Sequence, residues 1–131
     1  MNVRCPYCHA AAERVTGREI YPHRPDLAGL VIFRCVPCDA RVGTHRGSGK
    51  PLGTLGNAAT RAARRACHQM FDPLWKLGYM GRNEAYRALA ERMGIAVADC
   101  HISHWQADEC ERALPHIRAL RDETARTAVA S

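Results

Sequence analysis

The sequence predicts an α+β fold, in which a small antiparallel β unit at the N-terminus precedes a helical C-terminal region. Two pairs of cysteines frame a β-rich stretch over residues 1–45, and a Gly-rich stretch follows over residues 46–56. From residue 57 to residue 131 the apolar residues recur at helical spacing. A chain of 131 residues has room for one ordinary domain or for two small ones that share a core. We therefore expect a connector at 46–56 and a helical region that is packed on the β unit.

Three segments of the β unit have the composition of strands, at residues 14–21, 30–35 and 41–45. Pro22 and Pro25 mark a turn or loop between the first two segments. The pattern predicts a sheet of short strands with little core of its own.

The C-terminal region reads as a series of helices. Asn57 is suited to cap a helix that reaches Phe71, where the following Asp-Pro sequence ends it. A second helix is expected from residue 83 to a stop at Gly94. We also expect a short helix from Asp99 and a longer one over residues 107–125, interrupted or restarted at Pro115.

The first of these helices has two distinct faces in the predicted register. One face is expected to be apolar and carries Ala59, Ala63, Ala66 and Met70. The opposite face is expected to be solvated and cationic, and carries Arg61, Arg64, Arg65 and His68. Arg61, Arg64 and Arg65 are therefore candidate phosphate-binding residues, although a solvated charged face without a ligand explains the pattern equally well.

The two cysteine pairs have the spacing of metal ligands. Cys5 and Cys8 are separated by two residues, as are Cys35 and Cys38, and 26 residues lie between the pairs. A two-residue spacing lets a tight turn direct both sulfurs at one metal. The sequence therefore predicts one structural Zn²⁺ held by four thiolates in a zinc ribbon, and metal binding would supply much of the folding energy of so small a unit. A closed four-thiolate site leaves no position for activating water.

Composition and charge limit the other possibilities. The N-terminal residues contain no signal sequence and the longest apolar run is too short to span a bilayer, so we expect a cytosolic protein without a membrane partner. Disulfides are rare in that compartment, which favours metal ligation for the paired cysteines. The net charge of +6 permits binding to DNA or RNA, and it is equally consistent with solubility alone.

A second group of chemically active residues lies in the helical region. His68 and Asp72 are four residues apart and share a helix face, and His101 with His104 has a spacing of three. With Cys67, Cys100 and Cys110, these residues could form a second metal site or an acid–base pair. Alternatively, the cysteines are small buried hydrophobic residues and the histidines serve in packing or capping.

Several short motifs occur together in a fixed order. They are Cys-Pro-Tyr-Cys at 5–8, Cys-Val-Pro-Cys at 35–38, Val-Gly-Thr-His at 42–45, Pro-Leu-Gly-Thr at 51–54, Phe-Asp-Pro-Leu-Trp at 71–75, Ala-Tyr-Arg-Ala-Leu-Ala at 85–90 and Cys-His-Ile at 100–102. With these motifs, the chain resembles a family of zinc-finger-containing proteins common in phages and prophages. The resemblance implies a zinc ribbon joined to a helical segment, and it draws attention to His68, Asp72 and His101, which lie within or beside the motifs.

These observations favour a zinc-ribbon accessory protein that binds nucleic acid or a nucleic-acid-processing partner. One alternative is a metal-dependent hydrolase or nuclease that uses His68, Asp72 and His101. Another is a protein–protein adaptor that acts on a host enzyme. Because the four-cysteine site is closed, we expect a binding protein rather than an enzyme.

Overall fold

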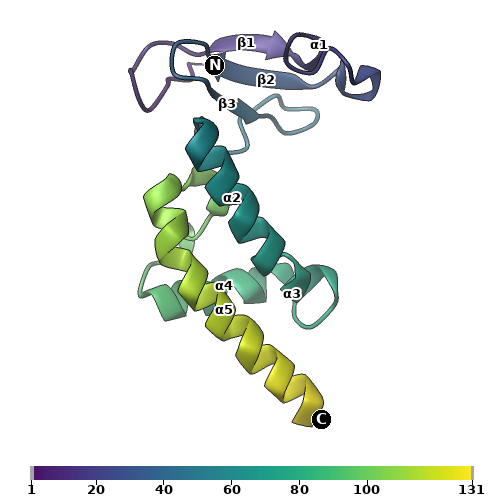
Figure 1. Ribbon diagram of the computed structural model, residues 1–131, viewed down its shortest axis with the longest axis vertical. Coiled ribbons are helices and arrows are strands. Elements are labelled where there is room, and N and C mark those ends of the chain that lie inside the picture. Colours follow the sequence, from purple (N-terminus) through teal and green to yellow (C-terminus); the bar gives the residue numbers. More distant parts are fainter. Residues whose placement is uncertain (1, 131) are drawn as a thin grey trace. The chain divides into compact units, whose positions relative to one another are not determined.

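The computed structural model describes residues 2–130 and confirms the α+β class (Figure 1). The chain divides into two compact units, Met1–Ala59 and Thr60–Ser131, which we call the first and second units. Residues 46–56 group with the first unit in this division, and the predicted domain boundaries stay a prediction. The expectation that the helical region packs on the β unit stays a prediction.

The first unit is built on a three-stranded antiparallel sheet in the order β1-β2-β3 (Figure 1). β1 is Glu13–Thr16, β2 is Val31–Cys35 and β3 is Ala40–Gly43. Residues Phe33, Cys35, Ala40 and Val42 of β2 and β3 are buried with Cys5 and Leu55 in one small core. So few buried side chains stabilise a unit of this size weakly, which makes a further source of stability necessary.

The strand predicted over residues 14–21 is wrong in its second half. β1 ends at Thr16, and the chain turns into the short helix α1, Gly17–Ile20, followed by the 3₁₀ turn Pro25–Leu27. The Gly17 N–H donates to the Leu30 carbonyl at 2.8 Å, and the Tyr21 N–H donates to the Gly17 carbonyl at 2.7 Å. The N–H of Gly17 thus makes the last bond at the end of β1, and its carbonyl accepts the first bond of the α1 turn.

The Gly-rich segment forms a hairpin with β3. The His45 N–H donates to the Lys50 carbonyl at 2.8 Å, and beyond this turn Thr44 pairs with Pro51 and Arg41 with Gly56. The turn contains Gly47 and Gly49 at φ 84° and 70°, a backbone conformation that favours glycine. Leu55 is completely buried, so the returning arm of this hairpin completes the core of the first unit.

The second unit consists of helices around a larger core. α2 is Ala58–Phe71, α3 is Pro73–Lys76, α4 is Arg82–Met93 and α5 is Ala107–Ala130, with 3₁₀ turns at Val97–Asp99 and Ile102–His104 between the last two. The residues that are completely buried in this core are Cys67, Phe71, Ala85, Leu89, Cys100, Ile102, Cys110, Ala113 and Ile117. The bounds of α2 and α4 agree with the prediction. The three cysteines here are buried, as expected of small hydrophobic residues.

The predicted apolar face of α2 is correct in part, since Ala63 and Met70 pack against the core as expected. The helix nevertheless buries other residues more deeply. Its buried residues are Thr60, Arg64, Cys67 and Phe71, whereas Ala59, which was expected on the apolar face, is exposed. Two polar side chains lie on the buried face because they have partners there. The Arg64 Nε–H donates to the Trp105 carbonyl at 2.7 Å, and Thr60 Oγ1 accepts from the Ala107 N–H at 3.2 Å. Thr60 thus supplies an acceptor for one of the unpaired N–H groups at the start of α5.

A glycine ends α4, whereas a proline lies in the interior of α5. α4 stops at Gly94, which has a left-handed φ of 68°, and the Ile95 N–H donates back to the Ala90 carbonyl at 3.0 Å. α5 continues through Pro115 without a break, contrary to the prediction. Proline removes the donor to the carbonyl of residue 111, but both residues are exposed, so water can bond that carbonyl.

We predict that Gly17→Ala destabilises the first unit. A Cβ atom at Gly17 would lie 1.8 Å from the Leu27 carbonyl oxygen and 2.8 Å from its carbon, and a backbone group cannot move aside cheaply. We expect a loss of about 1–3 kcal/mol in the free energy of unfolding. Gly29→Ala is the matched control, because nothing lies within 4 Å of a Cβ there. Denaturant titration measures both variants, and equal stabilities would contradict the close approach at Gly17.

Candidate metal centre

The first cysteine pair lies in a tight turn at the tip of a short hairpin. The Cys5 N–H donates to the Ala10 carbonyl at 2.9 Å, and the His9 N–H donates to the Cys5 carbonyl at 2.9 Å. Arg4 pairs with Ala11 below this turn. His9, directly after Cys8, has a left-handed φ of 65°. The backbone therefore bends sharply enough for Cys5 and Cys8 to lie on the same side.

The second pair lies in a similar turn between β2 and β3. Cys35 and Ala40 are paired at the end of the sheet, and the Asp39 N–H donates to the Val36 carbonyl at 3.1 Å. Asp39, directly after Cys38, has a φ of 49°. Each cysteine pair is therefore followed by a non-glycine residue in the left-handed region, and the two turns have the same local design.

The two turns bring the four cysteines together. The Sγ atoms of Cys5, Cys8, Cys35 and Cys38 all lie within 4.8 Å of one another, and the Cys8 and Cys35 sulfurs are 3.6 Å apart. Four thiolates around Zn²⁺ with bonds of about 2.3 Å are separated by about 3.8 Å. Cys5 and Cys35 are buried, Cys38 is half-buried and Cys8 is exposed. The number, type and spacing of these ligands fit one tetrahedral zinc ion.

The acidities of these thiols are shifted in opposite directions. Burial raises the pKa of Cys5, but hydrogen bonds from the backbone N–H groups of Cys8 and Tyr7 and from neighbouring thiols outweigh it, so the pKa falls to about 7. Burial and the three neighbouring thiols raise the pKa of Cys38 to about 12. Thiolates at this spacing repel one another, so one sulfur ionises readily while others resist. A divalent cation offsets that repulsion, and the donor set therefore suits a metal.

Tyr7 has a structural role that the cysteine spacing does not indicate. It lies between Cys5 and Cys8, and its hydroxyl oxygen accepts a hydrogen bond from the Asn57 N–H at 2.9 Å. Asn57 immediately precedes α2. The first cysteine turn is thereby joined to the backbone that leads into this helix.

The residues proposed for a second site are only partly brought together. His68 Nδ1 lies 3.1 Å from one Asp72 carboxylate oxygen and 3.2 Å from the other. His101 lies instead beside Tyr86 and His104, with ring centroids 6.1 Å and 5.9 Å away. Within residues 2–130, the four-cysteine cluster is the group of three or more His, Cys, Asp or Glu ligands placed to hold a metal. His68 and Asp72 thus form a pair, and His101 belongs to a different group of side chains.

The predicted arginine face of α2 is divided. Arg64 is buried and bonded to the Trp105 carbonyl, so it does not lie on a solvated face with its neighbours. Arg65 is exposed and Arg61 is half-buried. Contact of this face with nucleic acid stays a prediction, and it now concerns Arg61 and Arg65.

A small three-stranded sheet whose two cysteine turns gather four sulfurs defines a protein of the zinc-finger class. The chain matches the model of the zinc-finger-containing domain family over residues 1–120, and it belongs to this family. Comparisons with curated proteins and with solved structures gave no match. In the part of the chain that the structure describes, no helix has both the length and the apolar character needed to cross a membrane.

We predict that Cys35→Ser removes zinc from the protein and unfolds the first unit, because three ligands hold the metal weakly and the small core does not suffice alone. Metal analysis should show the loss of about one zinc per chain, while circular dichroism should retain most of the helical signal of the second unit. Cys100→Ala is the control, because Cys100 is buried in the other core. It should lower the melting temperature and keep the zinc. Stoichiometric zinc in Cys35→Ser would disprove the assignment.

Proposed function

We propose that this protein is a zinc-ribbon accessory factor that binds nucleic acid through its phosphate backbone. A phage or prophage setting, suggested by the sequence resemblance, is part of the same proposal. The observation that supports binding is the distribution of charge in the first unit, where the carboxylates are all paired and several cations are not.

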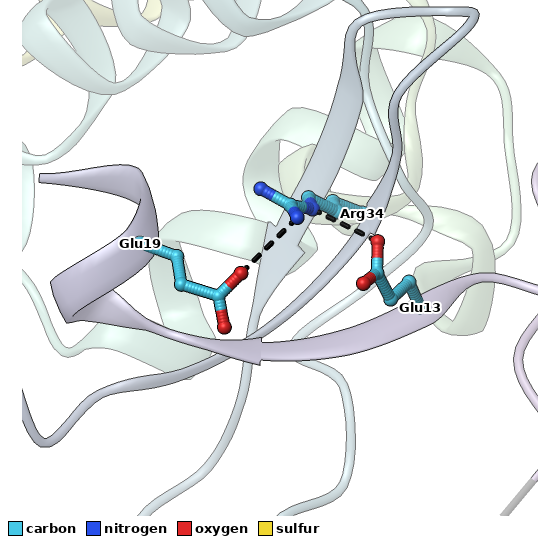
Figure 2. A network of polar contacts seen from close by, with 3 residues as sticks. All are labelled: Glu13, Glu19 and Arg34. Carbon is cyan, nitrogen blue, oxygen red and sulfur yellow. Dashed lines mark hydrogen bonds and ion pairs between the residues drawn. The ribbon is translucent and has the colours of Figure 1, made fainter.

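Each carboxylate of the first unit forms an ion pair with one of three arginines. Arg24 pairs with Asp26 at 2.7 Å, and Arg41 lies 3.9 Å from Asp39. Figure 2 shows Arg34 between Glu13 and Glu19, with its guanidinium nitrogens 3.1 Å from an oxygen of each. The acidic residues of this unit are thus engaged within the unit and offer little to an outside cation.

The remaining cations are available to an anionic partner. Arg14, Arg46 and Lys50 are exposed, and none of them has an ion-pair partner among residues 2–130. A further cation, Arg4, stands beside the ligand Cys5 and donates to the His9 carbonyl at 3.2 Å, where it can offset the negative charge of four thiolates around zinc. Uncompensated arginines on a rigid frame are suited to phosphate, which they bind through charge-assisted hydrogen bonds.

Binding of this kind has a characteristic dependence on salt. We predict that the protein binds labelled oligonucleotides with an affinity that falls steeply between about 50 and 200 mM salt, because each phosphate contact releases counterions. The slope of log affinity against log salt should become shallower by roughly 0.7–0.9 for each contacting cation that is neutralised. Fluorescence anisotropy measures this. A zinc-loaded protein with no salt-dependent binding to DNA or RNA would favour the adaptor alternative, in which the partner is a protein.

A hydrolase or nuclease is the second candidate, and the His68–Asp72 contact favours it. The carboxylate lies beside Nδ1, which orients the ring and leaves Nε2 as the nitrogen available to a substrate or metal. The His68 side chain is 40% exposed, so a ligand can reach it. Lys76 Nζ lies 3.9 Å from Asp72, and the same arrangement serves equally well as a surface ion-pair network.

We expect the structural interpretation of this pair to hold. The purified protein should cleave neither DNA nor RNA when Mg²⁺, Mn²⁺ or Zn²⁺ is supplied. His68→Gln should lower stability by no more than about 1 kcal/mol, since the pair is partly exposed, and should leave zinc content unchanged. His101→Asn is tested in the same way and should also leave the zinc content unchanged. Metal-dependent cleavage by the wild type that is lost in folded His68→Gln would make the protein an enzyme.

A further inference from the structure

The first unit has a cavity that none of the sequence motifs predicted. It has a volume of about 420 Å³ and lies between Arg14 of β1, Gly29 and Leu30 before β2, and the turn of residues 44–49. A second hollow of about 310 Å³ shares Arg14 and Gly49 with it. The first volume is within the range of sites that hold small molecules, and the cavity is formed entirely by residues of this unit.

The cavity is cationic in spite of one acidic residue. Arg14, Arg46 and His45 line the cavity. Neither arginine has an ion-pair partner among residues 2–130. Asp26 also lines the cavity, but both its carboxylate oxygens accept hydrogen bonds from Arg24, at 3.0 and 2.7 Å. An anion that enters therefore meets two free guanidinium groups and a carboxylate whose charge is already matched.

The rest of the wall is apolar or has no side chain. Leu30 is 42% exposed although it is a large hydrophobic residue, and it lines the cavity beside Val31. The Thr44 hydroxyl donates to the Val31 carbonyl at 2.8 Å, so its hydrogen is already used. Gly47 and Gly49 present only backbone to the cavity, which lets a ligand approach the turn closely.

We infer that this cavity holds one nucleotide of a single-stranded nucleic acid, with its phosphate on Arg14 and Arg46 and its sugar or base against Leu30. The inference rests on the proposed function and gives it a substrate class. In a duplex the bases are stacked and paired, so a nucleotide cannot enter a hollow. An unpaired strand can present one with its phosphate and its apolar ring together.

The test compares variants that remove one positive charge inside or outside the cavity. Arg14→Gln and Arg46→Gln alter the cavity, whereas Arg18→Gln alters an exposed, unpaired arginine of the same unit that does not line it. Binding is measured by anisotropy with a short labelled oligo(dT), the matching oligo(rU) and a DNA duplex of equal length. Zinc content and melting temperature confirm that each variant is folded.

We expect wild type to bind single strands more tightly than duplex. Each cavity variant should lose about tenfold or more in single-strand affinity, because a charge-assisted hydrogen bond to phosphate is lost. Arg18→Gln should lose much less. Leu30→Ser should reduce the preference for single strands and leave duplex binding unchanged, because it removes only the apolar wall. The oligo(dT) and oligo(rU) arms identify which kind of strand binds more tightly.

Two results would overturn the inference while leaving the proposed function intact. One is a cavity variant that binds single strands as well as Arg18→Gln does, and the other is a duplex that binds as tightly as the single strands. If wild type shows no salt-dependent binding to any of the three probes, the proposed function itself fails.

Discussion

The convergence of four cysteine sulfurs within 4.8 Å is the constraint on which the first unit depends. Its core contains one fully buried leucine and a few other side chains, too little to fix three short strands. The two cysteine turns fix the ends of the sheet, and their ligation by zinc would tie the N-terminal hairpin to β2 and β3. The free energy of metal binding is then a large part of the free energy of folding for this unit.

The second unit is stabilised differently. Its core is larger, and among the described residues the one charged side chain buried there is Arg64, whose Nε–H is bonded to the Trp105 carbonyl. That bond and the contact of Thr60 with the Ala107 N–H attach the start of α5 to α2. Removal of the Arg64 side chain would take the donor from the buried Trp105 carbonyl, and a buried polar group left without a partner costs more than the bond itself contributes. The two polar residues therefore specify how α2 and α5 meet.

Sequence patterns predicted the features that depend on local chemistry. The convergence of the four cysteines was predictable because a two-residue spacing constrains one turn, and the end of α4 because Gly94 takes a left-handed conformation. The burial of Arg64 on α2 was not predictable, because the carbonyl that it bonds, that of Trp105, is 41 residues away in the sequence. The hairpin in the Gly-rich segment was not predicted, because linkers and hairpin turns share that composition and the pairing of Thr44 with Pro51 has no local signal. Arg14 and Arg46 are far apart in sequence, so their common cavity had no local signal.

The hydrogen bond from the Asn57 N–H to the Tyr7 hydroxyl would couple zinc binding by the cysteines to the backbone at the start of α2. Tyr7 is held between two ligands, so its position depends on the geometry of the first cysteine turn. The residue before α2 is in turn held by Tyr7, and the first turn of a helix is its least stable part. With zinc in the site, loss of the metal would weaken this contact at the residue before α2. By thermodynamic reciprocity, anything that stabilises this start also raises the affinity of the cysteines for zinc.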